Sequence, residues 1–123
     1  MASWQDRVRD TSTTTGTGNF TVSGTPPAGY APWSSINLRV PVDYTIEAVD
    51  GSGIPTGDWE VGRGYLTSST VLVRTQAFEN SLGTTALINF AAGTKNVFCT
   101  IAAQRLESVI STISLLARGA FIP

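Results

Sequence analysis

The chain has 123 residues, a length typical of one domain, and we expect a single domain over residues 1–123. Charged residues make up only 14% of the chain and the formal net charge is −1, so the sequence cannot build the basic surface that a nucleic-acid partner requires. There is no histidine, and the one cysteine, Cys99, has no second cysteine to pair with. We therefore expect no disulfide, no metal, no cofactor and no enzymatic activity.

The start of the chain lacks the basic and apolar regions of a signal peptide. Its longest apolar stretch falls far short of the roughly 18 residues that a membrane span needs. These patterns predict synthesis in a cytoplasm and no membrane partner.

The N-terminal segment, residues 1–15, is predicted to be an extended arm because its threonine run favours β structure. Glycines then interrupt the run, so residues 13–18 are expected to form a hairpin turn that leads into a strand over residues 19–23. The unpaired edge of such an arm can pair with the sheet of a neighbouring chain.

A proline-rich loop precedes the most regular pattern in the sequence. A short helical turn is predicted over residues 31–36, with Pro32 at its start. Residues 38–48 then alternate between apolar and polar side chains, which indicates a half-buried strand. Pro41 has no backbone N–H to donate, so we place this strand at a sheet edge or at a bulge.

Further strands are predicted over residues 59–66, 71–78, 86–90 and 96–101, with a tight turn over residues 91–95. Short strands separated by glycine-rich turns are typical of an antiparallel sandwich or barrel, here spanning residues 16–101. The apolar residues of segment 102–118 follow helical spacing, so a C-terminal helix is expected there.

Few side chains suggest catalysis. Asp58 and Glu60 are two residues apart on a predicted strand, which places them on one face as in a glycosidase pair; the alternative is a solvated pair that flanks Trp59. Asp50, Ser52 and Asp58 lack the spacing of a calcium loop. Lys95, the one lysine, is a weak candidate for a general base. The tryptophans and tyrosines could form a carbohydrate platform, although such residues more often serve the core or a protein interface.

Three segments of the chain resemble a group of small tailed-phage proteins. They are Asp6-Arg7-Val8-Arg9-Asp10-Thr11-Ser12-Thr13-Thr14-Thr15-Gly16-Thr17-Gly18, then Pro55-Thr56-Gly57-Asp58-Trp59-Glu60-Val61-Gly62, and Asn89-Phe90-Ala91-Ala92-Gly93-Thr94-Lys95-Asn96-Val97-Phe98. Together they span roughly residues 5–105. The group is similar to decoration (cement) proteins of the phage head and to modules attached to tail fibres. The resemblance implies an antiparallel β-sandwich of jelly-roll kind, and no catalytic residue.

The first hypothesis for function is therefore a capsid decoration protein on the outer surface of a virion. Its expected partners are the major capsid protein and further copies of itself, as a dimer or trimer. A tail, neck or fibre component is the second hypothesis, and a carbohydrate-binding module for host attachment is the third. The candidate contact residues are Trp4, Val8, Tyr30, Trp33, Trp59, Leu106, Val109, Ile113 and Leu116.

Overall fold

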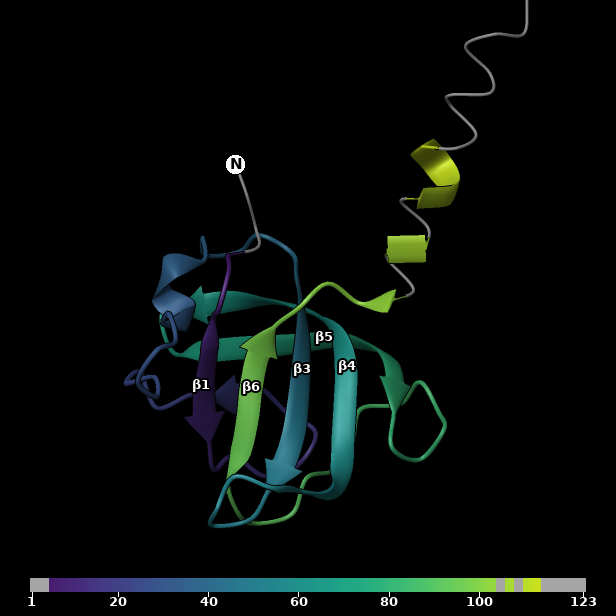
Figure 1. Cartoon of the computed structure of the whole chain (residues 1–123). Coiled ribbons are helices and arrows are strands. Elements are labelled where there is room, and N and C mark those ends of the chain that lie inside the picture. The colour runs from purple at the N-terminus through teal and green to yellow at the C-terminus, as the bar shows by residue number, and fades with distance from the viewer. Residues whose placement is uncertain (1–4, 104–105, 108–109, 114–123) are drawn as a thin grey trace, which may run out of the picture.

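The computed structural model describes residues 5–103, 106–107 and 110–113. In this part of the chain six strands form one antiparallel sheet (Figure 1). The all-β prediction is confirmed. The elements are β1 (Arg9–Ser12), β2 (Phe20–Thr21), the short 3-10 helix η1 (Trp33–Ser35), β3 (Val42–Val49), β4 (Pro55–Ser68), β5 (Val71–Asn80) and β6 (Lys95–Cys99).

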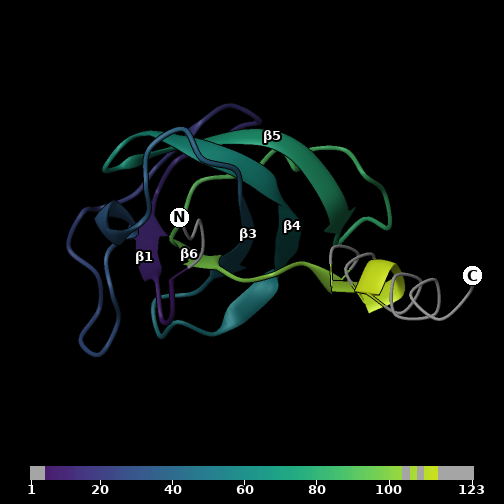
Figure 2. The same cartoon turned by 90° about the horizontal axis from the view of Figure 1, so that it is seen from above.

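The sheet curls until its two edge strands meet. Its strand order is β1-β6-β3-β4-β5-β2, and the view from above shows the strands arranged around a ring (Figure 2). Beside β2, Val22 forms a bridge with Ser12 of β1, and the Ser23 N–H donates to the Thr11 carbonyl at 2.9 Å. The described residues thus form a nearly closed barrel, and the two packed sheets expected of a jelly-roll sandwich are not clearly present.

Two glycines let β4 bend around the barrel. The pairing of β4 with β5 shifts register on either side of Arg63, at Gly62 and Gly64. A Cβ atom added to Gly64 would lie 1.9 Å from the Val73 carbonyl oxygen, and one added to Gly62 would lie 2.3 Å from that of Gln76. Because no side chain fits there, glycine allows the two backbones to approach closely where the strands curve.

The inner face of the sheet forms the core. Alternate residues of β3, namely Val42, Tyr44 and Ile46, are fully buried, as their period-two spacing predicts. Trp33 of η1 lies against the barrel and its indole N–H donates to the Val97 carbonyl at 3.0 Å. The predicted helical turn is confirmed as η1, with Pro32 directly before it.

The strand predicted over residues 38–48 begins later than expected. Leu38 and Arg39 lie in a turn, where Arg39 has φ of 62°, and the strand starts at Val42, directly after Pro41. Strand β3 pairs with β4 on one side and β6 on the other, so its placement at a sheet edge was wrong. Pro41 is tolerated because it precedes the ladder and no donor is needed from it.

Two other predicted segments also differ. Part of the predicted arm is strand β1, which pairs with β6 of the same chain and so has no free edge on that side. Residues 1–4 lie outside the described part of the chain. Residues 86–90 are not a strand in the structure; Phe90 makes an isolated bridge with Gly16 instead.

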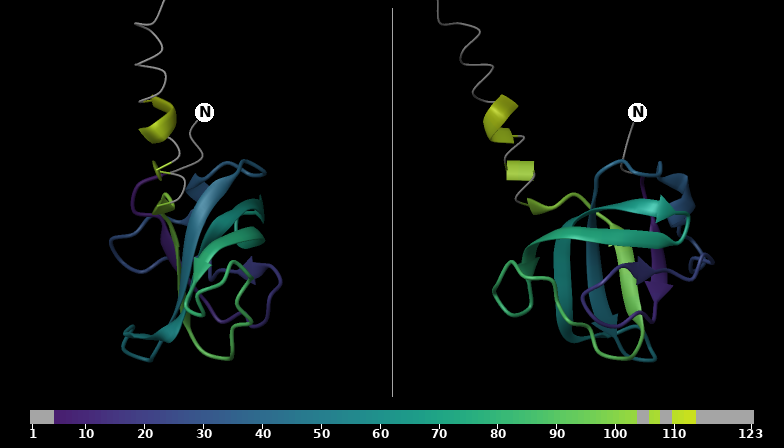
Figure 3. Two further views of the ribbon diagram at one scale, coloured as in Figure 1. Left: turned by 90° about the vertical axis from the view of Figure 1, so that its right-hand side faces the viewer. Right: turned by 180° about the vertical axis from the view of Figure 1, so that it is seen from behind.

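The C-terminal helix leaves the barrel at one end. Residues 103, 106–107 and 110–113 are helical, and the Leu106 N–H donates to the Ala102 carbonyl at 2.9 Å. The Asp43 carboxylate accepts the Ala102 N–H at 3.0 Å, which places a negative group at the helix start. The predicted helix is confirmed over these residues, which project beyond the barrel (Figure 3). Residues 114–118 of the prediction lie outside the described part of the chain.

Candidate functional site

A buried ion pair occupies the barrel interior. The side chains of Glu60 and Arg74 are both inaccessible to solvent. Glu60 Oε1 accepts Arg74 Nη2 at 2.5 Å and the Ile88 N–H at 2.6 Å. Its Oε2 accepts the Tyr44 hydroxyl at 2.5 Å and Arg74 Nε at 3.0 Å. Each carboxylate oxygen therefore receives two donors, which is the condition for a tolerable buried charge.

Arg74 connects this pair to two loops. Its Nη1 donates to carbonyls of the 16–18 turn at 3.1 and 3.3 Å, and its Nη2 donates to the Ile88 carbonyl at 2.8 Å. The guanidinium carbon also lies 4.8 and 5.4 Å from the ring centres of Phe20 and Phe90, a cation–π arrangement. One side chain thus holds the turn before β2 and the loop before β6 against β5, and its role is structural.

The paired-carboxylate hypothesis was wrong. Asp58 is exposed, whereas Glu60 is buried and both its oxygens are occupied, so they cannot act on one substrate. The alternative, a solvated pair, also fails for Glu60. Its partner Arg74 shares one face of β5 with buried Leu72, and an arginine at an inward position was the sequence signal that could have revealed the pair.

Tyr44 has a pKa far above the usual range of a tyrosine. Burial, and then the negative charge of Glu60, raise the pKa of Tyr44 far above the value of about 10 for a free tyrosine. A raised pKa contributes stability that is complete below pH 10 and is lost at higher pH, because the unfolded chain releases the proton first.

We expect Tyr44→Phe to be less stable than the native sequence by about 1 kcal/mol at pH 8. The difference in unfolding free energy between the variant and the native sequence should narrow as the pH rises above 10. Urea unfolding at a series of pH values measures this difference. A difference that stays constant to pH 11 would contradict this assignment.

The exposed side of β1, β6 and β3 carries a polar network. Arg9 Nη2 donates to Asn96 Oδ1 at 2.9 Å, and Asn96 Nδ2 donates to Glu47 Oε2 at 3.1 Å. The three side chains come from three adjacent strands of the sheet. Asn96 is 4% exposed, and its amide is held by both neighbours. The network therefore presents a guanidinium and a carboxylate in fixed positions on one face.

Tyr30 lies beside this network with two arginines against its ring. The guanidinium carbons of Arg7 and Arg9 are 4.6 and 4.7 Å from the ring centre. Arg7 is fixed further by donation from its Nε to the Gly29 carbonyl at 2.9 Å. Arg9 in the first place, through hydrogen bonding and charge, lowers the pKa of Tyr30. The surroundings of this tyrosine are thus electropositive.

Two hollows on this face share Glu47, and we refer to them together as the outer groove. One hollow of about 290 Å³ is lined by Arg7, Val8, Arg9, Tyr30, Glu47, Phe98 and Cys99. A second hollow of about 230 Å³ is lined by Thr45, Glu47, Pro55, Gly57, Asp58 and Trp59. Glu47 belongs to both hollows. The strands that carry the groove face the viewer in Figure 1, where β1, β6, β3 and β4 lie side by side.

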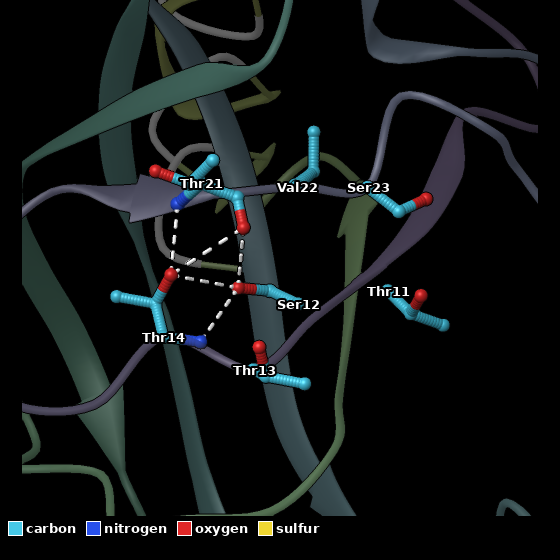
Figure 4. A pocket seen from close by; sticks show the side chains of 7 residues that line it. All are labelled: Thr11, Ser12, Thr13, Thr14, Thr21, Val22 and Ser23. Carbon is cyan, nitrogen blue, oxygen red and sulfur yellow. Dashed lines mark hydrogen bonds between the residues drawn. The ribbon is translucent and has the colours of Figure 1, made fainter.

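A third hollow, of about 310 Å³, marks the closure of the barrel between β1 and β2 (Figure 4). The Ser12 hydroxyl donates to the Thr21 carbonyl at 2.7 Å, and the Thr21 N–H donates to the Thr14 hydroxyl at 3.0 Å. The Thr14 N–H also donates to the Ser12 hydroxyl at 3.1 Å. The backbones of the two edges pair directly at an isolated bridge, Ser12 with Val22, and the hydroxyls of Ser12 and Thr14 add to this closure.

Other reactive groups have structural explanations. Burial raises the pKa of Cys99 to about 11, so the thiol is protonated at neutral pH. Lys95 is buried, which lowers its pKa, and its ammonium donates to the carbonyls of Thr14 and Ala91. These two bonds hold a turn in place, and neither of them joins Lys95 to a serine.

The suggested calcium ligands are also accounted for. Asp50 Oδ1 accepts the N–H groups of Ser52 at 2.8 Å and Ile54 at 3.0 Å, which closes the turn before β4. Within the described ranges, no group of three acidic, cysteine or histidine side chains could hold a metal ion. None of the helical segments in these ranges has the length and hydrophobicity of a transmembrane span.

The predicted contact residues divide into four groups. Tyr30 and Trp59 line the outer groove. Leu106 and Ile113 are exposed on the C-terminal helix. Val8 and Trp33 are each 1% exposed and belong to the core, so a partner cannot reach their side chains. Trp4, Val109 and Leu116 lie outside the described residues.

Comparison with known proteins supplies no relative. No protein-family model matches this chain, no curated protein matches it, and no solved structure matches it.

Proposed function

We propose that the chain is a structural protein of a tailed-phage particle, a decoration protein that binds the outside of the head and stabilises contacts between major capsid subunits. The observation that supports this proposal most directly is an exposed apolar stripe on the C-terminal helix. Leu106, Ile110 and Ile113 are 43%, 56% and 61% exposed, and their spacing places them on one side of the helix. The resemblance to virion proteins supports the same proposal.

The stripe is well placed for binding a partner. The helix start is fixed to the barrel, because Ala102 is buried and its N–H is bound by Asp43. The described helical residues lie beyond one end of the barrel, with the stripe exposed (Figure 3). Burying large aliphatic side chains against another subunit contributes roughly 1.5–3 kcal/mol for each side chain fully covered. Binding by contact area also suits a chain of low charge, since interface cores are depleted in charge.

Quantitative mass spectrometry of purified particles tests the location. A decoration protein should be present in hundreds of copies per particle, whereas the tail, neck or fibre alternative predicts a handful. Absence of the chain from particles would contradict both forms of the proposal.

Replacement of the stripe tests the mechanism. A triple variant with Leu106→Gln, Ile110→Gln and Ile113→Gln should keep the folded barrel and lose binding to heads that lack the native protein. The matched control, Glu107→Gln with Ser111→Gln, changes exposed helical residues of the same turns and should bind like the native sequence. Equal binding of both variants would show that the stripe is not the contact.

A further inference from the structure

We propose that the outer groove binds an acidic oligosaccharide, in which a carboxylate-bearing sugar lies next to neutral sugars. This site goes beyond the proposed structural role. The groove lies on the outer face of the sheet, whereas the apolar stripe lies on the C-terminal helix.

The arginine end of the groove is suited to a carboxylate. Among the described residues, neither Arg7 nor Arg9 forms an ion pair with an acidic side chain, although both guanidiniums are held against Tyr30. Glu47 reaches Arg9 through the amide of Asn96. Two guanidiniums that both approach the Tyr30 ring, neither of them paired with an acidic side chain among the described residues, favour an anion that can accept hydrogen bonds. The lowered pKa of Tyr30 agrees with this local excess of positive charge.

The opposite end is suited to a neutral sugar. Trp59 is 37% exposed and offers an aromatic surface, with the exposed carboxylate of Asp58 beside it. The apolar face of a sugar ring packs on an aromatic side chain while its hydroxyls donate to carboxylates. Glu47, shared by the two hollows, can accept from the sugar that joins them.

The mixture of charges also limits the ligand. Glu47 and Asp58 would repel a chain with a negative charge on every unit, such as a nucleic acid. Both ends together therefore favour an oligosaccharide with sparse carboxylates over a polyphosphate and over a purely neutral glycan.

Saturation-transfer NMR with the full chain tests the proposal. The acidic probes are hyaluronan tetrasaccharide and sialyllactose, and the neutral probes are the carboxyl-reduced hyaluronan tetrasaccharide and lactose. We expect at least one acidic probe to bind more tightly than its neutral counterpart. Binding of none of the acidic probes would overturn the proposal, as would equal binding of both kinds.

Matched variants locate the binding. Trp59→Ala and Arg9→Gln are each expected to weaken binding by about tenfold or more, the loss of roughly one charge-assisted or stacking contact. Arg9→Gln should also remove the preference for the acidic form. Leu38→Ala, an exposed apolar residue near the opposite end of β4, should bind like the native sequence.

Particle binding distinguishes this site from the decoration role. The groove variants should still bind heads, and the helical triple variant should still bind the oligosaccharide. If Trp59→Ala and Arg9→Gln instead release the chain from heads, the groove faces a protein and the oligosaccharide proposal is overturned.

Discussion

Replacing Glu60 with glutamine is expected to destabilise the protein by roughly 3–5 kcal/mol, as is typical when a buried ion pair loses one partner. Glutamine has nearly the same shape, but donors converge on both carboxylate oxygens. Whichever way the amide is turned, its NH₂ group faces two donors, and Arg74 remains buried without a counter-charge. Chemical denaturation at neutral pH measures the loss.

Two comparisons isolate the ion pair. Glu79→Gln makes the same change at an exposed position of β5 and should alter stability by no more than about 0.5 kcal/mol. The double variant Glu60→Leu with Arg74→Met removes both charges, so it should lose less than the sum of its two single variants. If the loss of stability in the double variant equalled the sum of the two single losses, the two side chains would contribute independently.

Replacing Gly64 with alanine is the second change with a large expected effect. The added Cβ would overlap the Val73 carbonyl, a backbone atom that cannot move aside without separating β4 from β5. We expect a loss of about 3 kcal/mol, at the upper end of the range for overpacking. Thermal and urea unfolding should both detect it.

The matched control for this prediction is Gly51→Ala. An added Cβ at Gly51 meets nothing within 4 Å, and no positive φ requires glycine there. This variant should change stability by no more than about 0.5 kcal/mol. If the two alanine variants unfolded at the same denaturant concentration, close approach of β4 and β5 would not explain the glycine.

Local patterns predicted local structure well. The alternation in residues 42–48 and 71–78 identified β3 and β5, because each strand has one face in the core. The arrangement of the strands was harder to predict. Pairing of β1 with β6 joins residues far apart in sequence, and the closure beside β2 depends on single bridges and hydroxyl groups that leave no periodic signal.

The candidate groove was only partly predictable. Tyr30 and Trp59 stood out as members of the small set of tryptophans and tyrosines, three of each. Arg9, Asn96 and Glu47 did not, because their contacts cross three strands and join positions 49 and 87 residues apart. Such side chains become neighbours only once the strand order is known.

The position of β6 has a consequence for how the protein is made. This strand is inserted between β1 and β3, and it is the last strand of the described chain to leave the ribosome. The meander of β3, β4 and β5 can form early, since short connections join its neighbours, whereas β1 must wait for a partner that is still being synthesised. Nascent chains that end before Lys95 lack β6, so the edges of β1 and β3 that pair with it are open. Open strand edges make such chains prone to aggregate.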